Sequence, residues 1–243
     1  MSDHQSLILS LKESRYFAGF AEQIEALEKR FSGVDDYLAK LNVCQRKWVY
    51  LEPIFKRGAL PHELGRFNRV DDEYRGIAVG IGVDPKVMSL CEIPGLKDTL
   101  ETILAQLDMC QKALNDYLEE KRQKFSRFYF IGDDDLLEIL GQGKNPAVIQ
   151  SHLKKLFSGI HKVAFNKENS LIKSMISSQN EYVELCQPVQ VTEEVEVWLL
   201  ELEKVMRVTL DKLLKQTLQN QGGLDIANCP SQICCLSEMI QFS

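Results

Sequence analysis

The sequence lacks a long apolar run, an excess of basic residues and any paired-cysteine motif, and each absence excludes a class of protein. The longest apolar stretch, residues 77–83, is interrupted by Gly80 and Gly82 and is far shorter than the roughly 18–20 residues that cross a bilayer. The formal net charge of −6 disfavours a protein that binds nucleic acid through its phosphates. The seven cysteines show no C-x-x-C spacing, which supports neither a disulfide framework nor a zinc site. The first residues lack the features of a signal peptide, so we expect a cytosolic chain with no membrane or nucleic-acid partner.

Catalytic motifs are missing as well. A phosphate-binding loop needs G-x-x-x-x-G-K-[ST], but Gly143-Lys144 is followed by Asn145-Pro146. No G-x-S-x-G or H-E-x-x-H segment occurs, so the histidines have no scaffold for triad or metal chemistry. These histidines are His4, His62, His152 and His161. We therefore predict no catalytic, cofactor or metal site in this chain.

The acidic run Asp133-Asp134-Asp135 is the most conspicuous charged cluster. Carboxylates in a row can hold Mg²⁺ or Ca²⁺, but this run precedes a short helical segment, Leu136 to Leu140. Acidic side chains at a helix start cap free N–H groups and complement the macrodipole. Helix capping is the favoured interpretation, and a metal-dependent hydrolase that uses these three carboxylates is the third-ranked hypothesis.

Long helical periodicities dominate what is present. Apolar residues recur at alternating steps of four and three in two stretches, which predicts two long helices with narrow seams. The first helix should end near Leu51, because Pro53 clashes with the preceding turn, and the second should run from Leu96 to about Lys124. A third long helix is expected from Glu193 to Gln219, ended by Gly222-Gly223. We expect the three to pack in one bundle at crossing angles of about 20°. The two seams are Phe20, Ile24, Leu27, Phe31, Val34, Leu38 and Leu41, then Leu96, Leu100, Ile103, Leu107, Cys110, Leu114 and Tyr117.

Shorter elements lie between these helices. A helix from Glu63 to about Ala78 should end at Gly80 and Gly82, and Asp84-Pro85 should open a short helix to Cys91. The run 128–131 consists of β-forming residues, Asn145-Pro146 should cap a helix that reaches Phe157, and 160–165, 171–176 and 182–185 alternate like strands. The helical tail 230–242 reaches the end of the sequence without a cap, which predicts a fragment of a longer polypeptide. The predicted fold is mainly α: an elongated bundle of long helices with a small antiparallel β-hairpin or meander near residues 160–186.

Two long segments go beyond composition: Q-R-K-W-V-Y-L-E-P-I-F at 45–55 and F-Y-F-I-G-D-D-D-L-L-E-I-L-G-Q at 128–142. Both resemble signature segments of the dynein heavy chains. They occur in the same order as in the family. The residue sequences of segments 57–61 and 130–135 are most similar to those of the cytoplasmic dynein 2 branch. The signature residues, for which the resemblance gives a structural role, are Gln45, Arg46, Lys47, Trp48, Tyr50, Leu51, Glu52, Pro53, Phe55, Phe128, Tyr129, Phe130, Asp135, Leu136, Leu137 and Glu138.

The resemblance implies a non-enzymatic fragment, 1–243, of the dynein linker, a helical lever that bends over a ring of AAA+ modules and so drives movement along microtubules. It implies a helical rod at 5–125, a middle region at 126–190 and further helices at 193–243. ATP and Mg²⁺ would bind in the absent ring, microtubules at the absent stalk, and light and intermediate chains at the absent tail. The implied setting is the cytoskeleton of the cytoplasm and cilium, in retrograde intraflagellar transport. A non-motor helical scaffold or coiled-coil interaction protein is the alternative.

Glycine and proline between the predicted helices mark the positions where such a lever could bend. The candidate hinge residues are Gly58 and Pro61, within 57–61, and Gly141 and Gly143, within 141–145, because hinges are a few loop residues between rigid elements. The turn of the predicted hairpin, at Lys167 and Glu168, is the candidate contact with the ring.

Overall fold

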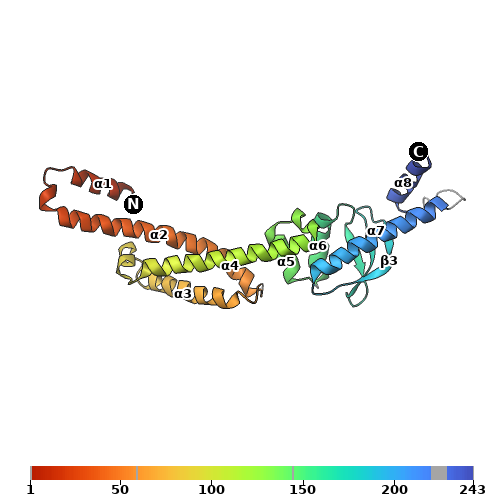
Figure 1. Cartoon of the computed structure of the whole chain (residues 1–243), viewed down its shortest axis with the longest axis horizontal. Coiled ribbons are helices and arrows are strands. Elements are labelled where there is room, and N and C mark those ends of the chain that lie inside the picture. The colour runs from red at the N-terminus through yellow and green to blue at the C-terminus, as the bar shows by residue number, and fades with distance from the viewer. Residues whose placement is uncertain (1, 59, 144, 220–228, 243) are drawn as a thin grey trace. The chain divides into compact units, whose positions relative to one another are not determined.

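The computed structural model describes residues 2–58, 60–143, 145–219 and 229–242, and the chain divides into two compact units, 1–116 and 117–243 (Figure 1). The first unit contains α1 (Ser2–Lys12), α2 (Ala21–Lys56), α3 (Leu64–Val83), short 3-10 helices and most of α4 (Leu96–Lys124). The second contains the end of α4 and all later elements. The predicted fold class, mainly α with a small antiparallel sheet, is confirmed. In the part of the chain that the structure describes, no helix is both long and apolar enough for a transmembrane span.

The core of the first unit is built around α4. Its six seam residues from Leu96 to Leu114 are at most 2% exposed, which confirms the predicted seam. They lie with buried side chains of the C-terminal half of α2 and the first turns of α3, where Phe55 stacks on Phe67 with ring centroids 4.6 Å apart. The thiol of Cys44 on α2 donates to the carbonyl oxygen of Leu100 at 3.9 Å. Burial raises the pKa of Cys44 to about 11, so this cysteine is an inert packing residue.

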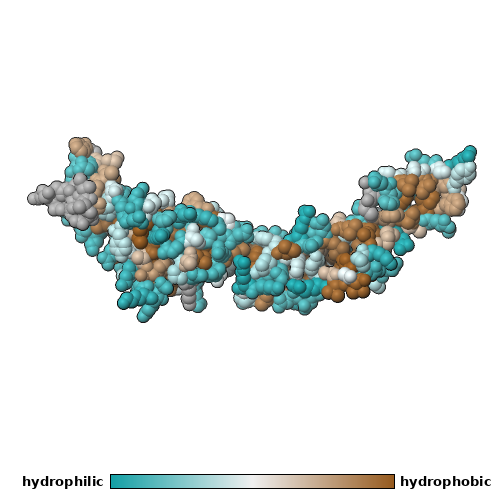
Figure 2. All heavy atoms as spheres, turned by 180° about the vertical axis from the view of Figure 1, so that it is seen from behind, coloured by the Kyte–Doolittle hydropathy of each residue, from teal (hydrophilic) through white to brown (hydrophobic). Residues whose placement is uncertain are grey.

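The seam in the N-terminal half of α2 has a different environment. Of its seven residues only Val34 is buried, whereas Phe20 is 57% exposed, Leu27 40% and Leu38 37%. Figure 2 shows apolar side chains gathered at the surface over the end of the molecule formed by α1 and the start of α2. The expectation that this seam would be buried in a bundle is therefore wrong for this half of the helix.

Pro53 does not end α2, which continues to Lys56. Proline removes one backbone donor and crowds the preceding turn, at about 3 kcal/mol. The following residues Ile54 and Phe55 are 8% and 1% exposed, and burying two such side chains contributes about 1.5–3 kcal/mol each. The packing gained by one more turn thus offsets the proline, and the predicted end at Leu51 is wrong.

Gly80 and Gly82 do not end α3 either; both lie inside it. Each interior glycine costs only about 1 kcal/mol relative to alanine. The helix ends at Val83, because the next residue, Asp84, has an extended backbone (φ −127°, ψ 90°) and the residue before a proline is disfavoured in the helical region. The predicted short helix after Pro85 is a 3-10 helix that begins at Val87 and ends at Glu92.

The second unit contains the three-stranded antiparallel sheet, in the order β1 (Lys162–Phe165), β2 (Leu171–Ile176) and β3 (Tyr182–Gln190). Strand β3 extends beyond the predicted end at Leu185. Between Glu184 and Val189 it advances five residues while β2 advances two, so an irregular bulge accommodates Pro188. The amide of Cys186 in this bulge donates to Thr209 Oγ1 on α7 at 3.0 Å. Bulges of this kind let proline occur within a sheet.

Helices α5 (Asp133–Gly141), α6 (Pro146–Leu156), α7 (Val195–Gln219) and α8 (Ser231–Gln241) complete the second unit. The side chain of Asn145 accepts from the amide of Ala147 at 3.1 Å, which confirms the predicted N-cap. The run 128–131 is not a strand, because Ser126–Phe130 form a 3-10 helix, η3. Tertiary packing of Phe128, which is fully buried, overrides the β propensity of these residues.

The third long helix, α7, lies in the second unit, where it contacts β3 and α8. The prediction of one bundle formed by the three longest helices is therefore wrong, and α3 takes the third place in the first unit. Seven residues of α7 are buried, including Trp198 and Val205. A buried face of this extent suits a helix that packs both on a sheet and on a second helix. The predicted stop at Gly222-Gly223 lies outside the described residues.

Candidate functional site

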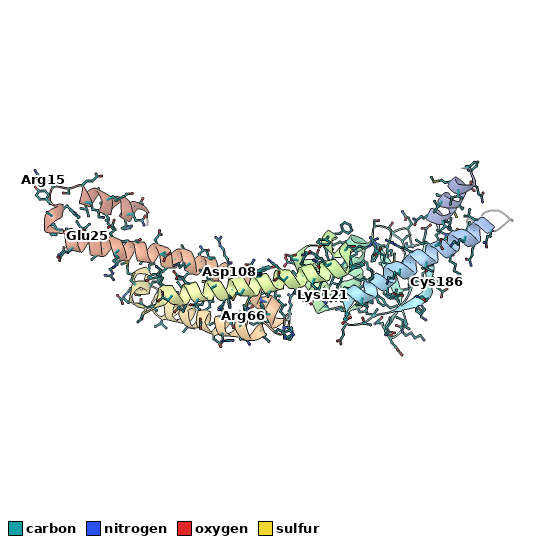
Figure 3. All side chains as sticks on the ribbon, viewed as in Figure 1. Arg15, Glu25, Arg66, Asp108, Lys121 and Cys186 are labelled. Carbon is teal, nitrogen blue, oxygen red and sulfur yellow. The ribbon has the colours of Figure 1, made fainter. Side chains whose placement is uncertain are left out.

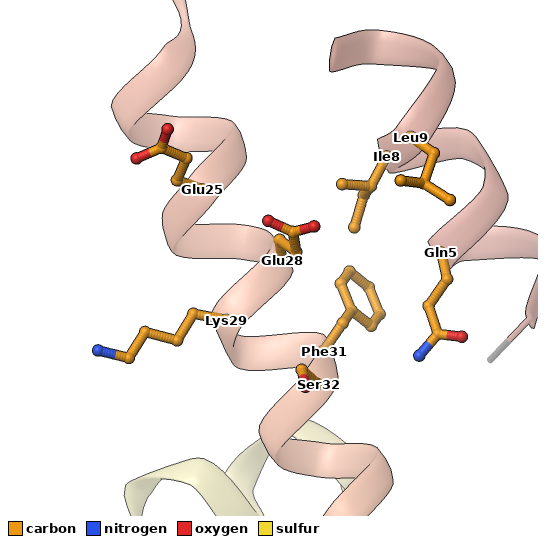
Figure 4. A pocket seen from close by; sticks show the side chains of 8 residues that line it. All are labelled: Gln5, Ile8, Leu9, Glu25, Glu28, Lys29, Phe31 and Ser32. Carbon is orange, nitrogen blue, oxygen red and sulfur yellow. The ribbon is translucent and has the colours of Figure 1, made fainter.

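A cavity of about 530 Å³ lies between α1 and α2. In Figure 4 Ile8 and Phe31 point toward each other across it, while Lys29 points away. A ligand site needs a few convergent polar groups in an apolar cavity, and this gap between two helices has none that converge. The residues that carry chemistry lie instead at the junctions between helices.

The first signature segment, 45–55, uses one face for the core and another for polar bonds to neighbouring helices. Leu51 and Phe55 are buried. Lys47 forms an ion pair with Asp108 on α4, and Trp48 Nε1 donates to Asp71 Oδ1 on α3 at 2.7 Å. Through this segment α2 is therefore bonded to both of the helices beside it.

Arg75 on α3 completes this junction. Its guanidinium donates to both oxygens of Asp71, at 2.9 and 3.0 Å, and to Glu52 Oε1 on α2 at 3.1 Å. It also lies 5.0 Å from the ring centroid of Trp48. The hydrogen bonds to Asp71 raise the pKa of Arg75 above its ordinary value. A planar guanidinium with two carboxylates and an indole is a geometrically specific contact.

Other signature residues of this segment face solvent. Gln45 and Arg46 are exposed, and Tyr50 is 37% exposed. Pro53 lies in the last turn of α2. The structure thus gives Lys47, Trp48 and Glu52 polar bonds between helices.

The second signature segment is also divided between core and surface. Phe128 is fully buried and meets Phe125 edge-on with centroids 5.0 Å apart. Leu136 is buried and Leu137 half-buried. Tyr129 and Phe130 are 55% and 70% exposed. Only part of the aromatic run therefore has an internal packing role.

Arg127, which the sequence did not single out, joins three elements at this place. Its guanidinium donates to Glu203 on α7 at 3.1 and 3.4 Å and to the carbonyl oxygen of Leu156, at the end of α6, at 3.0 Å. It lies 4.8 Å from the ring centroid of Phe157. Because Glu203 is 76 residues away in sequence, no local spacing could have predicted this bond.

A buried ion pair lies beside this junction, between Lys121 near the end of α4 (Figure 3) and Glu196 in the first turn of α7. The side chain of Glu196 is 3% exposed and that of Lys121 is 15% exposed. Lys124 lies 3.8 Å from the same carboxylate. Removing one partner of a buried pair leaves a desolvated charge, so this pair fixes how the two helices meet.

The acidic run does not act as predicted. Gly132 is the N-cap of α5 and no side chain caps it, so the three aspartates lie inside the first turn. Asp133 bonds to Arg122 at 2.6 Å and Asp135 to Lys155 at 2.6 Å. The hydrogen bond from Lys155 lowers the pKa of Asp135. The capping interpretation is wrong in this respect, and the run does not converge on one point as a three-carboxylate metal site would require.

His152 on α6 has acidic neighbours that the sequence did not reveal. Its Nε2 lies 3.0 Å from Glu138 Oε2 and its Nδ1 lies 3.7 Å from Asp135 Oδ1. The ring is 5% exposed. Asp135, Glu138 and His152 thus gather within 4.8 Å, contrary to the expectation that no histidine has such partners. The i, i+3 spacing on α5 was visible in the sequence, but its proximity to His152 depends on the turn between α5 and α6.

The four candidate hinge residues have different surroundings. Gly58 has φ +84° and precedes Ala59, which lies outside the described residues. Gly141 has open space where a Cβ would lie, whereas a Cβ on Gly143 would overlap the side chain of Val195 on α7. Pro61 starts the turn before α3. Lys144, in the second segment, also lies outside the described residues.

The proposed ring contact lies at the turn between β1 and β2. Lys167 and Glu168 are both exposed. Asn166 fixes the turn, because its Oδ1 accepts from the amides of Ser170 and Leu171 at 2.8 and 3.1 Å. The turn therefore presents two charged side chains from a well-bonded base.

Comparison with known proteins agrees with the two signatures. A family described as "Dynein heavy chain, N-terminal region 2" matches residues 1–217. The chain is 54% identical to cytoplasmic dynein 2 heavy chain 1 of Tripneustes gratilla and 50% identical to that of Homo sapiens, in each case over the whole of this chain. It is 37% identical to the cytoplasmic dynein heavy chain of Drosophila melanogaster over 90% of its length.

The chain spans only 5–6% of the length of these relatives. The identity to cytoplasmic dynein 2 heavy chains is higher than that to the Drosophila cytoplasmic dynein heavy chain. This confirms the resemblance that the residues of segments 57–61 and 130–135 indicate. The match over residues 1–217 favours the resemblance to dynein heavy chains over the alternative of an unrelated helical scaffold protein. The chain belongs to the dynein heavy chain family and corresponds to N-terminal region 2 of its members.

Proposed function

We propose that this chain is a segment of the mechanical linker of a dynein motor. In this proposal the linker changes shape over an AAA+ ring and so produces movement toward microtubule minus ends, in retrograde intraflagellar transport. ATP and Mg²⁺ act in the ring, microtubules bind the stalk, and light and intermediate chains bind the tail. All of these lie in other parts of the parent heavy chain, which works in the cytoskeleton of the cytoplasm and cilium.

The observation that carries this proposal is the density of side-chain bonds between helices within each unit. In the first unit Lys40 on α2 donates to Glu101 on α4 at 2.7 Å, beside the bonds of Lys47 and Trp48. In the second unit Arg127 and Lys121 bond to α7. An isolated helix is marginally stable, whereas helices bonded to one another along their length resist bending. Such bodies suit the transmission of force.

Arg127 and Arg207 offer a matched test, because both bond to Glu203. The guanidinium of Arg127 also reaches α6, whereas the side chain of Arg207 is 74% exposed and one turn from Glu203 on the same helix. In the parent heavy chain we expect Arg127→Ala to reduce microtubule gliding velocity several-fold while ATP turnover continues. Arg207→Ala should leave both rates near those of the unchanged motor.

The outcome that contradicts the proposal is equally specific. If Arg127→Ala loosens α6 and α7 by hydrogen exchange but gliding velocity does not change, stiffness of the second unit is not needed for motion. If ATP turnover falls in parallel with velocity, Arg127 supports the ring and not the lever.

The turn at Lys167 and Glu168 remains the proposed ring contact. The exposure of both side chains and the bonded base at Asn166 support this proposal. Replacing both residues by Gly-Ser should alter ATP turnover and gliding velocity of the parent motor, because a contact made and broken in each cycle biases one state over the other. Unchanged rates would reject the contact.

The hinge segments 57–61 and 141–145 also remain proposals. Straight and bent forms of the linker should differ in backbone angles at one of these segments, since hinge motion is absorbed by a few residues. The buried position of Gly143 against Val195 favours 57–61. Structures of both forms with unchanged angles at both segments would reject both.

A further inference from the structure

The start of α8 brings two cysteines together, with the thiol of Cys234 on the backbone of Cys229. Pro230 is the N-cap of this helix and Ser231 its first residue, so Cys229 occupies the position before the cap and Cys234 the fourth position of the helix. Side chains at these two positions pack against each other in the hydrophobic staple of helix N-termini. In this chain the staple positions hold two thiols instead of two aliphatic groups.

The contacts around these thiols agree with that geometry. Cys234 Sγ donates to the carbonyl oxygen of Cys229 at 3.6 Å, and Cys229 Sγ lies 3.6 Å from Thr217 Oγ1 at the end of α7. Both cysteines are half-buried and free. Desolvation and the neighbouring Cys229 thiol raise the pKa of Cys234 to about 11. Cys234 Sγ thus lies against the backbone of Cys229.

The backbone around the pair is held in place. The amide of Cys234 donates to the carbonyl oxygen of Pro230 at 3.0 Å. Glu181, from the turn before β3, accepts from both the amide and the hydroxyl of Ser231, and Ile233 is 2% exposed. The two thiols therefore meet in a pre-organised first turn of the helix, not in a chance encounter of loop residues.

We propose that Cys229 and Cys234 form a dithiol modification site, which a small disulfide such as oxidised glutathione converts to an intrachain disulfide. The thiolate of Cys229 attacks one sulfur of the oxidant, and a thiolate leaves. The thiolate of Cys234 then attacks Cys229 Sγ, and the second thiolate leaves. The two cysteines lose two protons and two electrons, and the oxidant is reduced to two thiols.

The order of these steps follows from ionisation. A thiolate is the attacking species in thiol–disulfide exchange, and the raised pKa of Cys234 makes its thiolate scarce at neutral pH. Cys234 therefore acts second, when the sulfur that it must attack is already in contact with it. Disulfides of intracellular proteins commonly have such a reversible role.

Cys235 is the matched control, because it is the next residue in sequence but its side chain is exposed. The 243-residue chain is treated with oxidised glutathione, cleaved with trypsin without reduction, and analysed by mass. No lysine or arginine follows Lys215, so all three cysteines fall in the peptide 216–243. We expect this peptide to lose the mass of two hydrogen atoms in the unchanged chain and in Cys235→Ser.

Cys229→Ser and Cys234→Ser should prevent this loss, and in Cys234→Ser the thiol of Cys229 should carry glutathione instead. Circular dichroism of each variant shows whether its helices are retained. The proposal is rejected if either variant still closes a disulfide, because Cys235 would then be a partner. It is also rejected if the unchanged chain takes up glutathione at Cys235 alone.

Discussion

The seams of α2 and α4 have the same spacing and opposite environments. Both repeat apolar residues at alternating steps of four and three. The six α4 residues from Leu96 to Leu114 are at most 2% exposed, whereas Phe20 and Leu27 at the start of α2 are 57% and 40% exposed. Periodicity therefore identifies the face of a helix that is able to pack, but whether this chain supplies something to cover it depends on tertiary structure.

The most direct test of this difference compares one leucine from each seam. Leu107 on α4 is fully buried and Leu27 on α2 is 40% exposed. Leu107→Ala should lower the free energy of unfolding by about 3 kcal/mol, because it removes buried methyl groups and leaves a cavity. Leu27→Ala should cost less than about 1 kcal/mol. Urea unfolding followed by circular dichroism measures both, and equal losses would show that α2 is covered in solution.

Two glycines, one at the end of α5 and one in the turn after it, extend the comparison to positions where side chains are absent. Gly143→Ala should destabilise the second unit by about 2 kcal/mol, because its Cβ would overlap the side chain of Val195 and the core must shift to accept it. Gly141→Ala meets no atom within 4 Å and should be close to neutral. Thermal unfolding distinguishes them, and adding Val195→Ala should recover part of the first loss.

Two arginines that share Glu203 give a smaller effect. Arg127→Lys should lower stability by about 1–2 kcal/mol, since lysine cannot reproduce the paired bonds to a carboxylate and the stacking on Phe157. Arg207→Lys should change it by less than about 0.5 kcal/mol, because its side chain is 74% exposed. Urea unfolding of both variants is the measurement. A larger effect at Arg207 would mean that Glu203 is held mainly from its own helix.

The elements that the sequence predicted well are those set by local chemistry. The bounds of α4, the Asn145 cap before Pro146 and the positions of the three strands, apart from the extension of β3 to Gln190, follow from periodicity, capping and turn residues. The errors lie where packing opposes local preference. Ile54 and Phe55 are buried strongly enough to carry α2 past Pro53, and the burial of Phe128 turns a β-forming run into a 3-10 helix.

The site could be predicted only in part, for the same reason. The signature segments located Trp48, Glu52 and Glu138, which all bond across elements. Their partners Asp71, Arg75 and His152 could not be chosen from the sequence, because the distance between them is set by how α3 and α6 pack. Arg127 was missed entirely, since its partner Glu203 is 76 residues away.

The smallest expected effect is a pH dependence of stability that distinguishes Glu181, before β3, from Glu184 in β3. The bonds from the hydroxyl and amide of Ser231 lower the pKa of Glu181, whereas Glu184 is an exposed residue of β3. A carboxyl whose pKa is lowered in the folded state stabilises that state above its ordinary pKa of about 4.3, and the contribution is lost as pH falls through the lowered value. Attachment of α8 should therefore weaken below about pH 4.

Hydrogen exchange of residues 231–241, corrected for intrinsic rate, measures this loss. Glu181→Gln should remove most of the pH dependence and Glu184→Gln should keep it; a dependence that survives Glu181→Gln would assign it to another carboxyl.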